Sequence, residues 1–404
     1  MKFDKKSAIR FIILLGIISL LGDVMYEGAR SVNGPYLKIL GANAVVVGFI
    51  VGLGELLGYG IRIVSGYFTD KTKAYWLFTI IGYGVLITVP LLSLTGVWQF
   101  AALFMILERI GKAIRSPAKD TILSQATKQV GTGFGFGLHE FFDQIGAVIG
   151  PLIFASLFYF IGSGSKSTAD YQKGYSIYFY VFILLMAAVF FTYFLFKNPE
   201  KFETAKPQTE DEDKLSRTFW LYTVFTFLAT FGFVSFVLIG YHLKQNNIIS
   251  DSAIPLFYAI AMGVDAVISL VIGKIYDNLK KKRNNEQEGL LALFIIPILT
   301  AIIPALVFSS NVILIFIAVF IWGVVMGTHE TIMKAAIADI TSMKKRATGY
   351  GIFNTAYGLS VFIGSIVIGL LYDYSITLLI IILIFFEILS IPVLYKLTKE
   401  VKKT

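Results

Sequence analysis

The chain of 404 residues alternates between long apolar runs and short polar segments. Twelve of the runs reach about 20 residues, the length that a helix needs to cross the hydrocarbon core of a bilayer. Lipid offers no partner for backbone N–H and C=O groups, so these runs are predicted to be membrane-spanning helices. The predicted spans are residues 8–36, 43–69, 75–95, 97–126, 134–160, 175–197, 217–244, 252–276, 288–308, 312–342, 347–372 and 375–397.

The composition supports this prediction of an all-α integral membrane protein. Hydrophobic residues make up 56% of the chain and charged residues only 15%, against about 25% charged residues in soluble domains. The net charge of +9 arises from lysines and arginines at both ends of the chain and in alternate loops. The positive-inside rule therefore places both termini in the cytoplasm, for a multi-pass protein of the plasma membrane.

Several classes of function are disfavoured by residues that the sequence lacks. There is no cysteine, and so no disulfide and no thiolate ligand for a metal ion. We find no nucleotide-binding loop, no paired-histidine metal motif and no selectivity-filter sequence, so we expect neither an enzyme nor a channel, and no metal or other cofactor. The basic residues form no separate domain with interleaved aromatics, so nucleic acid is not an expected partner.

A repeated motif divides the chain. Gly66-x-x-x-Asp70 is followed by Lys71, and Gly273-x-x-x-Asp277 is followed by further lysines, each near the end of an apolar run. Residues 198–216, which include prolines and an acidic cluster, are predicted to be a cytoplasmic linker. The sequence thus predicts two pseudo-symmetric six-helix bundles, residues 1–197 and 217–404.

This organisation resembles the major facilitator superfamily over essentially the whole chain, because the superfamily has the same Gly-x-x-x-Asp-basic motif after its second and eighth spans. A second motif in the fifth span resembles one associated with antiporters of that superfamily, and its spacing is Gly-x8-Gly-x3-Gly-Pro. Its residues are Gly137, Gly146, Gly150 and Pro151. Segments such as GDVMYEGARSVNGPYL resemble a group of prokaryotic permeases whose substrates are mostly unassigned. The resemblance implies a transporter that works by alternating access.

The Gly-x-x-x-Asp motif also has a physical interpretation. Glycine lets two helices approach closely, and an aspartate at a helix end can bond a neighbouring helix or a basic side chain. We predict a cytoplasmic latch made of Gly66, Asp70, Lys71, Gly273 and Asp277. The alternative is that both aspartates are ordinary solvated charges.

Ionisable residues in the first and fourth spans are candidates for proton coupling or for the substrate cavity. Each costs at least about 2.5 to 3.5 kcal/mol at the bilayer centre, so they are expected to face a cavity or a partner. Asp23, Glu27 and Arg30 share one helical face, and Glu108 and Arg109 lie near the predicted midplane. Arg109 resembles the buried fourth-span arginine that is implicated in proton coupling in the superfamily. Two interpretations remain open: a carboxylate that carries a proton, or a permanent Glu27–Arg30 ion pair.

A third group of polar residues belongs to the fifth span and the end of the fourth. His139 and Asp143 are one turn apart beside Glu140, and a histidine–carboxylate pair suits proton relay. The same residues could instead form a gate with Arg115 or Lys119. The second half has fewer charges, and there Asp265, Trp322 and Tyr357 are expected to line the cavity.

The predicted function is secondary active transport of a small molecule, by proton-coupled antiport in the direction of efflux. The alternative is uptake of a small anionic solute by proton-coupled symport, in which Arg30, Arg109 and Lys112 would attract the solute. The expected partners are the solute, protons and the lipid bilayer, and the expected oligomeric state is a monomer.

Overall fold

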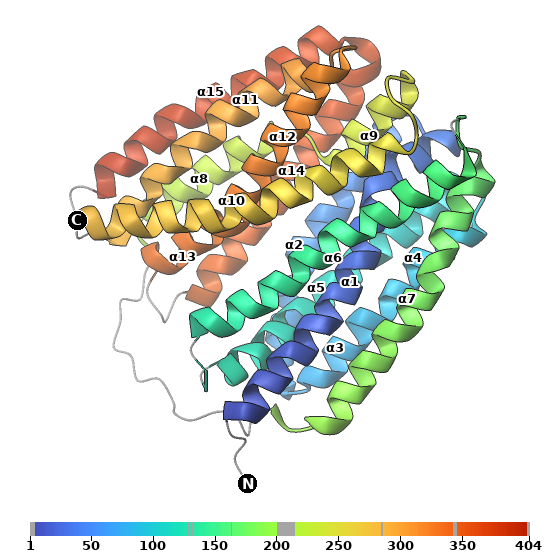
Figure 1. The fold of residues 1–404 in the computed structure, drawn as a ribbon. Coiled ribbons are helices and arrows are strands. Elements are labelled where there is room, and N and C mark those ends of the chain that lie inside the picture. The colour runs from blue at the N-terminus through green and yellow to red at the C-terminus, as the bar shows by residue number, and fades with distance from the viewer. Residues whose placement is uncertain are drawn as a thin grey trace. The chain divides into compact units, whose positions relative to one another are not determined.

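The computed structural model describes residues 5–127, 129–130, 132–162, 164–199, 215–283, 286–341 and 346–401. The regular elements of this part of the chain are all helices (Figure 1). They are α1 (Lys5–Ile39), α2 (Ala44–Thr72), α3 (Tyr75–Gly84), η1 (Val85–Ile87), α4 (Thr88–Leu91), η2 (Leu92–Leu94), α5 (Trp98–Thr127), α6 (Thr132–Ile161), α7 (Thr168–Leu195), α8 (Arg217–Phe231), α9 (Phe236–Gln245), α10 (Ala253–Arg283), η4 (Glu286–Phe294), α11 (Ile295–Val307), α12 (Val312–Thr328), η5 (His329–Met333), α13 (Lys334–Ile340), α14 (Arg346–Tyr374) and α15 (Ile376–Val401).

The prediction of an all-helical membrane protein is confirmed. Eleven segments of the described chain are long and apolar enough to cross a bilayer. The remaining predicted span is helix α5, which has the required length but carries several charged residues, among them Glu108, Arg109 and Lys112. Every predicted span therefore appears as helical structure.

Four spans that were predicted as continuous α-helices are interrupted. The span at 288–308 begins as the 3-10 helix η4 and continues as α11. The span at 75–95 consists of α3 and α4 with 3-10 turns after each. The span at 217–244 is broken between α8 and α9, at residues 232–235, which we call the α8–α9 break. The span at 312–342 contains the π-helix η5. Hydropathy alone does not report such interruptions, because a helix and a broken helix bury the same apolar side chains.

Capping residues explain where some of the helices begin. Ser167 and Asp170 form a reciprocal capping box at the start of α7, each side chain bonding the other residue's backbone N–H. The side chain of Asn311 accepts hydrogen bonds from two backbone N–H groups of the first turn of α12. These side chains satisfy N–H groups that a helix cannot satisfy internally.

The described chain forms two compact units. The first comprises residues within Met1–Ala42, Leu57–Pro207 and Ser250–Ala259, and the second comprises residues within Asn43–Leu56, Gln208–Ile249 and Ile260–Thr404. These units differ from the predicted halves by two short segments, and the predicted boundaries at 197 and 217 stay a prediction. Residues 200–214 of the predicted linker lie outside the described residues.

Close contact between α1 and α6 organises the first unit. A methyl group on Gly150 would overlap the carbonyl oxygen of Val24 and would lie 2.7 Å from the backbone nitrogen of Gly28. Gly146 lies against Leu20 in the same way. The two helix backbones can touch only because these positions lack side chains.

Helix α8 lies against α14 and α15 in the second unit. The buried side chains there include Phe219, Tyr222 and Leu394, and the Tyr222 hydroxyl donates to the Met333 carbonyl at 2.8 Å. That bond fixes the end of the π-helix η5 to α8. The interrupted spans at 217–244 and 312–342 are thus part of one core.

Candidate functional site

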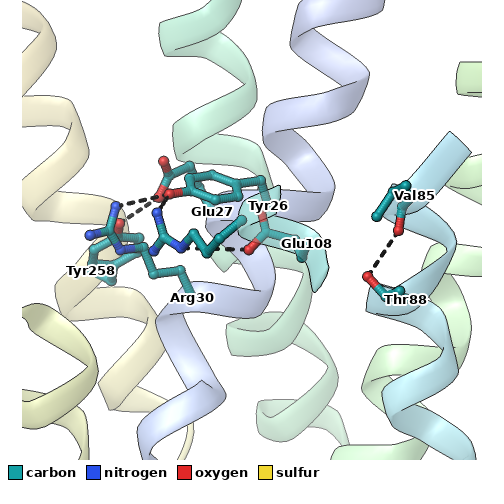
Figure 2. Close-up of polar contacts among 8 residues, drawn as sticks. Tyr26, Glu27, Arg30, Val85, Thr88, Glu108 and Tyr258 are labelled. Carbon is teal, nitrogen blue, oxygen red and sulfur yellow. Dashed lines mark hydrogen bonds and ion pairs between the residues drawn. The ribbon is translucent and has the colours of Figure 1, made fainter. Parts of the chain in front are cut away.

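Tyr26 is the centre of a highly charged cluster in the first unit. It is 2% exposed, and its hydroxyl accepts hydrogen bonds from Arg109 and, at 3.4 Å, from Arg30 (Figure 2). The ammonium of Lys112 lies 3.8 Å from the centre of the same ring. We call Tyr26, Arg30, Arg109 and Lys112 the Tyr26 cluster. A tyrosine suits this position because its hydroxyl accepts hydrogen bonds while its ring face attracts cations.

Two buried acids, Glu108 and Glu27, belong to the same region of the first unit. Arg109 Nε lies 3.7 Å from Glu108 Oε2, and Glu108 is 6% exposed. Glu27 is 8% exposed and accepts a hydrogen bond of 2.5 Å from the hydroxyl of Tyr258, at the start of α10 (Figure 2). Tyr258 and Glu27 both belong to the first unit. The contact ties α10 to the predicted carboxylate of α1.

Asp23 lies one turn before Glu27, where α1 meets α6. Its Cβ is 3.1 Å from the position that a Cβ on Gly146 would take. The predicted face of α1 therefore exists, but its members have different neighbours. Asp23 lies beside α6, Glu27 bonds α10, and Arg30 bonds Tyr26 within α1.

A second polar group includes Ser19, which lies about two turns before Tyr26 on α1, and side chains of neighbouring helices. Lys119 Nζ donates to Ser19 Oγ at 3.2 Å, and the guanidinium of Arg115 lies 4.7 Å from the ring centre of Tyr83. His139 Nδ1 lies 3.5 Å from Asp143 Oδ2, so the structure brings the predicted histidine–carboxylate pair together.

The other predicted residues of the fifth span lie in different surroundings. Glu140 is exposed and accepts a hydrogen bond from Gln144, one turn further along α6. Among the described atoms, nothing lies within 4 Å of the position that a Cβ on Gly137 would take. Gly146 and Gly150 therefore pack helices, and Gly137 has no such contact in the described part of the chain. Pro151 follows Gly150 within α6.

In both Gly-x-x-x-Asp motifs, the glycine packs against a neighbouring helix. A Cβ on Gly66 would lie 3.6 Å from Pro117 of α5, and one on Gly273 would lie 3.4 Å from Thr331 of η5. Asp70 and Asp277 are exposed, and neither bonds to another described residue. Lys71 is also exposed, with its ammonium 5.8 Å from the ring centre of Tyr67.

The second unit forms a different polar contact near its motif. Asp339 Oδ2 accepts hydrogen bonds from Lys280 Nζ at 2.8 Å and from the Tyr276 hydroxyl at 2.7 Å. Lys280 and Tyr276 flank Asp277 on α10. The structure thus places a bond between helices beside the predicted motif, with Asp339 as its acid.

Asp265 of α10 lies against α12. It is 2% exposed and accepts a hydrogen bond of 3.1 Å from Ser269, whose hydroxyl is also 3.3 Å from the Gly327 carbonyl. A Cβ on Gly327 would lie 2.8 Å from Asp265 Oδ1. The predicted buried acid is therefore held against the last turn of α12, next to η5.

Trp322 supports the α8–α9 break. Its indole Nε1 donates to the Val234 carbonyl at 2.8 Å, and its ring stacks on Phe233 with centroids 5.4 Å apart. Trp322 is 0% exposed and uses its indole N–H in this bond, so it supports the break, and its place in the cavity wall stays a prediction. Tyr357 is partly exposed, with its ring centroid 6.3 Å from that of His329.

His329 opens the π-helix η5 and contacts the same break. It is 3% exposed, neither ring nitrogen has a hydrogen-bond partner among the described residues, and its ring centroid lies 5.0 Å from that of Phe233. A π-turn is a common feature of functional sites. The second unit therefore joins a broken helix to a π-turn through aromatic rings.

Three residues that reasoning from the sequence did not select are Tyr26, Tyr258 and Tyr83. Tyr26 could have been found, because it lies four residues before Arg30 on α1 and so shares its face. Tyr258 and Tyr83 carry no such signal, because their partners are distant in the sequence. The structure also shows no group of acidic and histidine side chains suited to a metal ion within the residues that it describes.

The fold and these buried charges define a multi-pass membrane protein with polar interiors. Its sequence matches the family model described as Major Facilitator Superfamily over residues 12–293 and 289–404, and the chain belongs to this family. An uncharacterised protein of Mycobacterium tuberculosis is 35% identical over 395 residues, 96% of this chain and 93% of the relative. An uncharacterised MFS-type transporter of Methanocaldococcus jannaschii is 25% identical over 377 residues, 90% and 88% of the two chains.

Solved structures agree with this assignment at the level of the fold. The nucleoside transporter NupG superposes with a TM-score of 0.68 at 13% identity, covering 96% of this chain and 98% of that one. A bacterial homologue of the lysosomal transporter Spinster superposes with a TM-score of 0.70 at 15% identity, covering 98% of both chains. Membership of the Major Facilitator Superfamily makes the protein a transporter and not an enzyme.

Proposed function

We propose that the protein is a secondary active transporter that moves a small molecule by alternating access and exchanges it for protons. The observation that carries this proposal is the Tyr26 cluster beside two buried carboxylates, Glu27 and Glu108. Buried charges are costly unless they are compensated, so gain or loss of one proton changes the balance of the whole cluster. Such a cluster can bind a proton in one state and a charged solute in another.

Asp23 and Glu27 are the proposed proton carriers. Each lies on α1 in a setting that a second helix supplies, α6 for Asp23 and α10 for Glu27. Binding of a proton to Glu27 would alter its hydrogen bond with the Tyr258 hydroxyl. In an antiporter, the proton and a cationic or amphipathic solute compete for the same carboxylates, which gives exchange and favours efflux.

The remaining predicted residues receive supporting roles in this proposal. His139, Glu140 and Asp143, with Arg115 and Lys119, form a gate or a proton relay. Asp70 and Asp277 belong to a cytoplasmic latch, in which we now include Asp339 because it bonds Lys280. We further propose two six-helix bundles, a monomer in the plasma membrane, and cytoplasmic termini.

A second function has a specific observation in its favour. Arg30, Arg109 and Lys112 all approach one tyrosine, and such a group of cations would attract an anionic solute. Proton-coupled symport of a small anion is therefore the alternative. The names of the solved structures do not decide the substrate, because at this level of identity only the fold is shared.

The test is transport by the full chain in lipid vesicles that contain a pH-sensitive dye. Solutes from several classes, including cationic amphiphiles, nucleosides and small carboxylates, are screened for movement of protons when a solute gradient is imposed. Antiport moves protons against the direction of the solute, and symport moves them with it. We expect proton movement opposite to a cationic or amphipathic solute.

Two substitutions then locate the proton site. Asp23→Asn and Glu27→Gln keep the size of each side chain and remove its titration, so we expect at least one of them to abolish coupled proton movement. Asp373→Asn is the matched control, because this aspartate of α14 is exposed. Unchanged coupling in both variants would disprove the proposed site, and no proton movement with any solute would disprove the coupling.

A further inference from the structure

Glu387 of α15 is a buried acid that the proposed transport cycle does not use. Its side chain is 0% exposed, and neither carboxylate oxygen bonds to a described residue. A Cβ on Gly232 would lie 2.5 Å from Glu387 Oε1 and 3.0 Å from the Leu383 carbonyl oxygen. The carboxyl group therefore lies directly against the residue with which the α8–α9 break begins.

Among the side chains that the structure describes, the helices around Glu387 bring no charge close to it. Helix α8 has one charged residue, Arg217 at its start, which lies 3.7 Å from Glu400 near the other end of α15. Helix α11 has none, and α14 carries Arg346 and Asp373 only near its ends. The other charged residues of the neighbouring elements and of α15 itself are Glu286 and Glu288 of η4 and Lys396, Lys399 and Glu400 of α15. The titratable tyrosines of these helices are Tyr222, Tyr350, Tyr357, Tyr372, Tyr374 and Tyr395.

Two physical effects oppose a negative charge at this position. An isolated carboxylate in an apolar interior costs many kcal/mol, and such a group takes up a proton instead. The last carbonyl groups of α8 also carry the negative end of the helix dipole, and Gly232 is the residue at that end. A neutral carboxylic acid avoids both penalties.

We propose that Glu387 is a proton-binding site of the second unit, and that release of its proton requires a rearrangement of the α8–α9 break. The break offers groups that could bond an ionised carboxylate once they move. The backbone N–H groups of Val234, Ser235 and Val237 donate to no described residue, and the Ser235 hydroxyl is buried without a partner there. The use of this proton in transport rests on the proposed function, whereas its presence on Glu387 does not.

Infrared difference spectroscopy tests the bound proton directly. A neutral carboxyl group has its own carbonyl-stretch band, which shifts when the proton is exchanged for deuterium. The purified full chain at neutral pH is compared with Glu387→Gln and with Glu400→Gln, a control on the same helix whose carboxylate is paired with Arg217. We expect the band to vanish in Glu387→Gln alone, and a band that survives there would overturn the proposal.

The link to the break is tested with Trp322, which bonds Val234. Replacing Trp76, Trp98 and Trp220 by phenylalanine leaves Trp322 as the one tryptophan of the chain. Its emission should change as the pH rises, and this change should be absent in Glu387→Gln and retained in Glu400→Gln. An identical pH response in all three proteins would overturn the link.

A metal-ion explanation is tested in parallel. The melting temperature is measured in sodium, lithium and choline chloride at equal ionic strength. A rise with sodium or lithium that disappears in Glu387→Gln would show a cation site in place of the proton site. The measurements on Glu387 do not depend on the vesicle assay. If Asp23→Asn and Glu27→Gln leave coupling unchanged there, the proposed function fails while the proposal for Glu387 can still hold.

Discussion

Two buried polar sites, one in each unit, are built in opposite ways. In the first unit, the Tyr26 cluster lies on the continuous helices α1 and α5, and its cations share one hydroxyl and one ring. In the second unit, His329 and Glu387 lie beside interrupted helices, with no hydrogen-bond partner for their side-chain polar atoms among the described residues. The Tyr26 cluster brings its charges together, whereas His329 and Glu387 are isolated groups that are most stable when neutral.

This difference indicates different tasks for the two units. A cluster whose charges compensate one another keeps those charges at little cost in free energy. Its arrangement changes only when a bound proton or solute changes its net charge. An isolated buried acid responds instead to whether water or a donor can reach it. Broken helices supply such donors, since their end groups lack the usual internal partners. The first unit suits binding of charged ligands, and the second suits a change of conformation.

The largest expected effect concerns the continuous helices of the first unit. In Gly150→Ala, the added methyl group would overlap backbone atoms of α1, which cannot move aside as a side chain can. We expect a loss of stability of about 3 kcal/mol, seen as a lower melting temperature in detergent. Gly137→Ala is the control in the same helix and should change little, because its surroundings within the described chain are open. Equal effects of the two substitutions would contradict the packing described for α1 and α6.

The corresponding change in the second unit should cost less. In Gly232→Ala, the methyl group would meet the flexible end of Glu387 and the Leu383 carbonyl. We expect a loss of about 2 kcal/mol, together with a shifted carboxyl band in the infrared spectrum. Gly263→Ala provides the control, since no described atom approaches that position. An unshifted band would argue against the contact between Glu387 and the break.

A smaller effect is expected for the hydroxyl of the Tyr26 cluster. Tyr26→Phe keeps the ring that faces the cations and removes the acceptor that Arg30 and Arg109 share. We expect a loss of about 1 to 2 kcal/mol in stability, and weaker binding of a charged solute by the vesicle assay. Tyr67→Phe serves as the control, because Tyr67 is 61% exposed. Unchanged stability and transport in Tyr26→Phe would show that the shared hydroxyl contributes to neither.

The smallest effect is expected at the proposed latch. Asp339→Asn weakens the partly exposed bond to Lys280, and we expect a loss of about 1 kcal/mol or less, reduced further at high salt. Asp277→Asn should have almost no effect on stability, because Asp277 is exposed. The reverse order in thermal melts would show that Asp277 contributes more to the latch of the second unit than Asp339 does.

Much of the candidate site was predictable where a local rule applies. Helical spacing placed Asp23, Glu27 and Arg30 on one face, and it correctly paired His139 with Asp143. Spacing could not show that Glu27 bonds Tyr258, 231 residues later, or that Arg109 bonds Tyr26. It also gave no sign that the indole of Trp322, which is predicted to line the cavity, donates to the Val234 carbonyl.

The sequence by itself determined that the chain is a membrane protein, which segments span the bilayer, and to which family the chain belongs. Burial of apolar side chains in lipid depends on runs of about 20 residues, and such runs are local properties of the chain. Tertiary structure alone decided where the seventh and tenth spans are interrupted, which tyrosine the cations share, and which acids are left alone. Those outcomes depend on hydrogen bonds and close contacts between helices, whose partners the chain brings together only when it folds.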